Sequence, residues 1–207
     1  MKPLKLAPTI STPELSYYSL DSDVAKRIKE RETANIVEGY VLTRLSSNED
    51  IYNFYAEINV DNDKLWALFK SLVIQMPDEV ALIYQHIDNS PKYGMYVDKF
   101  ALINFLDRLE VELCQDGFLE YGVISHRENS LDEIFVKKTK YLQCWGMEVE
   151  RFISVMEQYE LDVYDNLNFI DEYPLQTESL ERHIPDCIKT FDILKSFEDE
   201  FGDEQLL

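Results

Sequence analysis

The feature that most constrains the fold is a run of two alternating segments and one helical segment in residues 118–159. Apolar and polar residues interleave in 118–126 and again in 134–141, with a polar, glycine-free turn at 128–130 between them. This alternation predicts two antiparallel strands joined by a turn. Apolar residues then recur at helical spacing in 147–158. The expected unit is therefore strand, strand, helix.

The same order of elements precedes this stretch twice. The first unit has expected strands at 36–45 and 51–60 and a helix at 62–76, and the second has strands at 80–87 and 93–97 and a helix at 98–113. Asp61 and Asp98 stand where they can cap the two helices. The strict alternation of residues 51–60 predicts a sheet with one face in water.

Three such ββα units predict an α+β fold, an antiparallel or mixed sheet with the helices packed on one face. The expected shared core consists of Leu68, Phe69, Leu72, Phe105, Leu109, Phe152 and Met156. We expect residues 1–207 to form a single domain whose three units span 36–159. A split into two domains is the alternative, but the connections are short and no Gly/Ser-rich linker separates the units.

Additional segments flank the three units. Residues 1–14 contain three prolines and are expected to form an extended arm. A short helix follows, capped by Ser22 or Asp23 and ending near Glu32. Residues 160–207 are an acidic C-terminal segment with a helix expected from Pro185. The inward-facing residues expected on that helix are Ile188, Phe191, Leu194, Phe197 and Phe201.

The formal net charge of −20 is unevenly distributed along the chain. Residues 146–207 contain 17 acidic and only 4 basic side chains. Such a field repels nucleic acid and anionic membranes, and it attracts basic partners in a salt-dependent way. The alternative is that the charge serves solubility alone.

The sequence lacks the motifs of common catalytic and metal sites. It has no glycine-rich phosphate loop, no nucleophile elbow and no zinc-protease motif. The cysteines Cys114, Cys144 and Cys187 are odd in number and lack metal-ligand spacing, so we expect a reducing compartment and no disulfide. No catalytic residue, metal or cofactor is expected. Without a signal peptide or a run of about 18 apolar residues, we expect a cytoplasmic protein without a membrane span.

A basic cluster, Lys137, Lys138 and Lys140, interrupts the acidic sequence. With Phe135 and Tyr141 nearby, it resembles a strand that binds nucleic acid, but the overall charge opposes this interpretation. We expect instead a lysine-bearing edge strand, because such charges discourage edge-to-edge aggregation.

Within residues 118–174, the runs FLEYGVI, EIFVKKTKYLQCWG, FISVMEQYEL and NLNFIDEYP resemble the C-terminal part of small immunity proteins that accompany bacterial polymorphic and contact-dependent toxins. This resemblance lies in texture, an acidic α+β protein with an aromatic strand that ends in Trp-Gly. It implies a cytoplasmic protein that binds and occludes a toxin domain.

Two hypotheses of different class follow. The first is a binding protein, an immunity protein that neutralises a basic toxin domain. The second is an acidic interaction or adaptor protein, of cellular or phage origin, in which the charge serves solubility or imitates nucleic acid. The expected partner-binding residues are Tyr159, Glu160, Asp162, Tyr164, Asp165, Phe169, Asp171, Glu172 and Tyr173. This mixture of aromatic anchors and carboxylates is typical of charged interfaces. The alternative is that the segment straps the sheet and buries its aromatic residues in the protein itself.

Overall fold

The computed structural model describes residues 2–45 and 51–202 of the chain. The helices are α1 (Asp23–Arg31), α2 (Leu65–Gln75), α3 (Lys99–Leu106), α4 (Glu110–Gln115), α5 (Val149–Gln158) and α6 (Thr190–Phe201). Short 3-10 helices are η1 (Leu15–Tyr17), η2 (Asp107–Leu109), η3 (Ile170–Glu172) and η4 (Leu180–Arg182). The strands are β1 (Ile10–Ser11), β2 (Gly39–Arg44), β3 (Phe54–Asn59), β4 (Glu79–His86), β5 (Lys92–Asp98), β6 (Leu119–Arg127), β7 (Ser130–Val136), β8 (Leu142–Gly146) and β9 (Gln176–Thr177).

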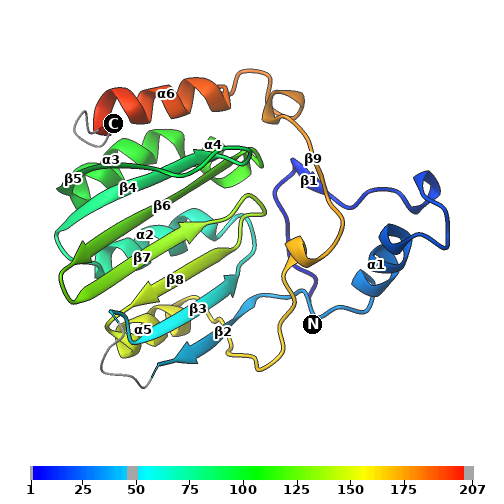
Figure 1. Ribbon diagram of the computed structural model, residues 1–207, viewed down its shortest axis with the longest axis horizontal. Coiled ribbons are helices and arrows are strands. Elements are labelled where there is room, and N and C mark those ends of the chain that lie inside the picture. Colours follow the sequence, from blue (N-terminus) through cyan, green and yellow to red (C-terminus); the bar gives the residue numbers. More distant parts are fainter. Residues whose placement is uncertain (1, 46–50, 203–207) are drawn as a thin grey trace.

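The central element is a seven-stranded sheet in the order β2-β3-β8-β7-β6-β4-β5. Every neighbouring pair in it is antiparallel. A separate antiparallel pair joins β1 to β9. The predicted α+β class is confirmed, and the sheet is antiparallel throughout (Figure 1).

A layer of helices covers one face of the sheet and lies behind it in Figure 1. Helix α2 contacts α3, α4 and α5, and α6 contacts β4 and β5. The helices and the strand residues that face them share one buried core. The expected core residues Leu68, Phe69, Leu72, Leu109, Phe152 and Met156 are all buried in it, and Phe105 is partly buried against it. The prediction that the helices pack on one face is therefore confirmed.

The third unit differs from the prediction. Only residues 134–136 of the strand expected at 134–141 belong to a strand, because β7 ends at Val136 and a further strand, β8, begins at Leu142. Between them the chain turns, with the Lys140 N–H donating to the Lys137 carbonyl at 2.8 Å and Lys140 in a left-handed conformation at φ 65°. The third unit is thus βββα, and a regular ββα repeat is not confirmed.

The lysine cluster does not lie on an edge strand, and that prediction was wrong. Its members occupy the turn between β7 and β8, two interior strands of the sheet. Lys140 is only 4% exposed, and its ammonium donates to the Leu119 carbonyl at 2.9 Å. Burial lowers the pKa of Lys140 to about 8. Lys138 and Lys140 alternate with other residue types as they would on a strand, and for this reason the turn between β7 and β8 was not predicted.

Several helix boundaries also differ from expectation. The Asp98 cap is confirmed, since its carboxylate accepts from the N–H groups of Phe100 and Ala101. The helix that it caps is broken by η2 into α3 and α4. Ser22 caps α1, as expected. The last helix starts at Thr190, well after Pro185.

The register of that last helix also corrects two of the residues predicted to face inward. Ile193, Phe197 and Phe201 are buried, whereas Phe191 is 76% exposed. Ile188 lies before the helix and is exposed as well. The buried residues of α6 follow i, i+4 spacing from Ile193, and Phe191 lies on the opposite, solvent-exposed side of the helix.

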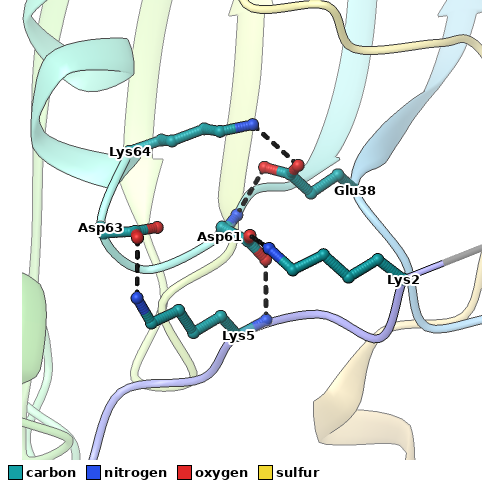
Figure 2. A network of polar contacts seen from close by, with 6 residues as sticks. All are labelled: Lys2, Lys5, Glu38, Asp61, Asp63 and Lys64. Atoms are coloured by element: carbon teal, nitrogen blue, oxygen red, sulfur yellow. Dashed lines mark hydrogen bonds and ion pairs between the residues drawn. The ribbon is translucent and has the colours of Figure 1, made fainter.

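Residues 2–14 run extended along one end of the sheet, and an acidic loop holds their beginning (Figure 2). The buried carboxylate of Asp61 accepts from the Lys5 backbone N–H at 2.8 Å and from the Lys2 ammonium at 2.9 Å. Lys5 also pairs with Asp63 at 2.7 Å. Asp61 does not cap α2, because its side chain is used to hold this arm.

A second extended segment, residues 160–174, crosses the free edge of β2, and we call it the strap. The Tyr40 N–H donates to the Asp162 carbonyl at 3.0 Å, and the Tyr164 N–H donates to the Tyr40 carbonyl at 2.8 Å. These bonds occupy backbone groups that an edge strand would otherwise expose. Gly39 permits the close approach, because it has φ 146° and a Cβ there would lie 2.4 Å from Tyr164 Cε2.

Candidate binding surface

The second face of the sheet is turned toward the viewer in Figure 1, and no described helix covers it. Side chains from the three strands β3, β8 and β7 point to this side. They are Tyr55, Glu57, Glu133, Phe135, Gln143 and Trp145, and we call this surface the open face. All of them are half-buried except Phe135, which is buried.

Strand register arranges these side chains in two rows across the strands. Tyr55 lies opposite Trp145, which lies opposite Glu133 on the next strand. In the neighbouring row, Glu57 lies opposite Gln143 and Gln143 opposite Phe135. Each row therefore combines aromatic and carboxylate groups at the spacing of directly paired strand residues, about 5 Å.

Contacts within the open face fix the orientation of its side chains. The Tyr55 and Trp145 rings have centroids 4.8 Å apart. The Gln143 amide donates to the Tyr55 hydroxyl at 3.0 Å and to the Glu57 carboxylate at 3.2 Å. Because these groups hold each other in place, little side-chain entropy remains to be lost on binding.

The glycine in β6 leaves room for one of these rings. A Cβ at Gly122 would lie 2.7 Å from Phe135 Cδ2 and 2.4 Å from the Ile134 carbonyl oxygen. Gly122 and Phe135 are directly paired in the register. A side chain at Gly122 would therefore collide with the Phe135 ring and the β7 backbone.

The acidic groups of the open face differ in how they are satisfied. Glu57 accepts from Gln143, as described above. Glu133 makes no hydrogen bond or ion pair with any of residues 2–45 and 51–202, and burial raises its pKa. Of the two carboxylates of the open face, only that of Glu133 lacks a partner among the described residues.

A cleft of about 820 Å³ opens where β7 begins and β8 ends. Trp145 and Glu133 line it, so the cleft is continuous with the open face. The beginning of α5 and the end of α2 form its other wall. Asp132 also lines this cleft, and burial is the main cause of its raised pKa.

The strap places the residues that were predicted to bind a partner in two different environments. Phe169 and Tyr173 are buried, with the Phe169 ring 4.9 Å from Tyr141 and Arg27 over the Tyr173 ring at 5.2 Å. The Tyr159 hydroxyl lies 2.8 Å from that of Ser71. These aromatic rings are used inside the protein.

The acidic residues of the strap are mostly exposed. Glu160, Asp162, Asp165 and Asp171 lie on the surface. Glu172 is also exposed, but its carboxylate accepts from the Phe169 N–H at 2.6 Å and stabilises η3. The structure therefore offers carboxylates from this segment to a partner, without the aromatic anchors that were expected beside them.

Of the predicted residues, Tyr164 packs against Gly39 at the edge of β2. Asp171 lies close to the open face, since its negative charge contributes to the raised pKa of both Tyr141 and Tyr55. The strap and the open face are thus neighbouring surfaces. Tyr55 and Glu57 lie on the face that the alternation of residues 51–60 predicts to be in water, whereas the position of Trp145 was not predicted, because β8 was not recognised as a strand.

The residues that could take part in nucleophilic catalysis are poorly placed for it. Cys114 and Cys144 are buried, and burial raises the pKa of Cys114 to about 12. A thiol with a raised pKa is a poor nucleophile at neutral pH. His86 stacks on Phe118, whereas His183 pairs with Glu178 in another part of the chain.

No family model, curated protein or solved structure matches this chain. Within the described residues, no cluster of His, Cys, Asp and Glu side chains has the arrangement of a metal site. Nor is any described helix both long enough and apolar enough to cross a bilayer. The function must therefore be inferred from the geometry of the surface itself.

Proposed function

We propose that this chain is a non-enzymatic binding protein that occludes a basic protein domain with its open face. By the resemblance noted in its sequence, the partner would be a bacterial toxin domain, and the chain would act as its immunity protein in the cytoplasm. The strap, with Asp162, Asp165 and Asp171, would border the interface and extend its negative potential.

The observation that carries this proposal is the row Tyr55, Trp145 and Glu133 on a face that no described helix covers. Aromatic residues supply much of the energy of protein interfaces, and carboxylates select a basic partner. Nucleic acid is disfavoured as a ligand, because a net charge of −20 repels phosphate groups.

The proposal is tested by capture followed by reconstitution. The tagged wild-type chain is used to isolate a basic protein from an extract of the native organism, with elution by rising salt. The isolated protein is then tested for toxicity and for inhibition by an equimolar amount of this chain. Failure of the purified pair to associate, or an acidic partner, would contradict the proposal.

A matched variant shows whether the open face is responsible. Tyr55→Ala with Trp145→Ala removes both half-buried rings, and we expect a loss of affinity of about a hundredfold or more. Phe191→Ala serves as the control, since it removes an exposed aromatic residue on α6, outside the open face. That control should bind the partner as the wild type does.

A further inference from the structure

Glu133 and Trp145 form a directly paired couple at the mouth of the cleft. They lie opposite each other on β7 and β8, and both line the cleft of about 820 Å³. Tyr55 lies on the β3 side of Trp145, with the ring centroids 4.8 Å apart. The Trp145 ring is thus supported on one side and borders open space and a carboxylate on the other.

The Glu133 carboxylate lacks a cationic partner among the described residues. Its side chain is half-buried, and residues 2–45 and 51–202 give it neither a hydrogen bond nor an ion pair. Glu120, by contrast, is buried but accepts from the Lys138 N–H at 2.9 Å and lies 3.4 Å from the Lys137 ammonium. A carboxylate that loses water without gaining a partner is costly, and a bound cation would remove that cost.

The other charged residues described in the cleft do not pair with Glu133. The Lys99 ammonium is committed, because it donates to the carbonyls of Ile74 at 3.0 Å and Met76 at 2.7 Å. Arg127 and Arg151 are exposed, and their charges act to lower the pKa of Asp132. The pKa of Glu133 is instead raised by burial. The cleft therefore retains room and negative charge beside Trp145.

We propose that the Glu133–Trp145 pair binds an arginine side chain of the basic partner. This inference rests on the proposed function for the source of the arginine, and it adds the residue type recognised. A guanidinium group is planar, so it can stack on the Trp145 indole while two of its N–H groups donate to the Glu133 carboxylate. An ammonium group would gain the charge interaction but neither the stacking nor the paired donors.

The experiment uses the full chain labelled with 5-fluorotryptophan and the peptide acetyl-Gly-Arg-Gly-amide. Only two tryptophans are present, and buried Trp66 serves as the internal reference for Trp145. We expect the peptide to shift the Trp145 fluorine resonance saturably, with a dissociation constant on the order of millimolar, and to leave that of Trp66 unchanged. The same peptide with citrulline, a neutral isostere of arginine, should produce no shift.

Glu133→Gln should weaken arginine binding about tenfold, and the charge-matched control Glu200→Gln should leave it unchanged. The inference is overturned if the arginine and citrulline peptides act alike on the wild type, if the Trp145 resonance does not move, or if Glu133→Gln binds normally. The same peptide with lysine in place of arginine should bind more weakly, and equal affinity for it would overturn the choice of arginine. None of these measurements uses the partner. The arginine site can therefore be refuted while the proposed function stands, because a basic partner could still bind elsewhere on the open face.

Discussion

The two faces of the sheet are built from the same strands but have different chemistry. The covered face presents fully buried residues to the helical layer, among them Ala56, Ile58, Leu82, Tyr121 and Leu142. The open face presents half-buried rings and carboxylates, of which Tyr55 and Glu57 are joined through hydrogen bonds from Gln143. We infer that stability comes mainly from the covered face, which leaves the open face available for recognition.

The largest expected effect comes from a cavity on the covered face. Leu68 on α2 is fully buried, so Leu68→Ala should lower the free energy of unfolding by about 2–5 kcal/mol. Thr43→Ala, at an exposed position of β2, is the control and should change it by less than about 0.5 kcal/mol. Urea denaturation measures both. Similar losses for the two variants would contradict the inference that stability comes mainly from the covered face.

Lys140 is a charged residue buried on the mainly apolar covered side, and its titration tests this exception. Its folded-state pKa is lowered from 10.5 to about 8, so between these values the unfolded chain binds more protons than the folded chain. Stability should therefore rise with pH across this window. Relative to Lys140→Met, the wild type should gain about 2–3 kcal/mol between pH 7 and pH 10.5. A constant difference between the two proteins would show that Lys140 is not buried as a cation.

The edge of β2 can be opened by one methyl group. Gly39→Ala places a Cβ against the Tyr164 ring at a backbone conformation that suits glycine alone. We expect a loss of about 1–3 kcal/mol and faster amide exchange at Tyr40 and Tyr164, whose N–H groups join the strap to β2. Unchanged exchange at both amides would mean that the strap is held by other contacts.

The smallest effect is expected on the open face. Because burial raises the folded-state pKa of Glu133, the folded chain binds more protons there than the unfolded chain, and stability falls as pH rises from the unfolded value toward the folded value. Glu133→Gln should remove this loss and leave stability at pH 7 unchanged or up to about 1 kcal/mol higher. Thermal unfolding at pH 4 and pH 7 measures it. A clear destabilisation at pH 7 would indicate a partner within the protein.

The sequence predicted the elements with regular periodicity and missed those defined by single backbone conformations. Alternation and helical spacing located the strands of the first two units and the helical layer. The turn at Lys140 was hidden because 134–141 alternates without a glycine or proline. The prediction for Asp61 failed for a different reason, because its carboxylate is taken by Lys2 and Lys5 from a distant part of the chain.

For the candidate surface, composition identified suitable residue types but not their exposure. Tyr159, Phe169 and Tyr173 have the character of interface anchors, yet their hydrophobic contacts lie within the chain. Trp145 gains its position from pairing with β3 and β7, which lie far from it in sequence or across a hidden turn. Such long-range register is not contained in a local pattern.

The most direct test of the account compares two variants that remove the same charge. The captured basic partner is titrated against the wild type, against Glu57→Gln with Glu133→Gln on the open face, and against Asp162→Asn with Asp165→Asn on the strap, over a series of salt concentrations. We predict that the open-face variant loses about tenfold or more in affinity and has a weaker salt dependence, whereas the strap variant changes less than about threefold. Wild-type binding by the open-face variant, with the loss confined to the strap variant, would contradict the account and assign the interface to the strap.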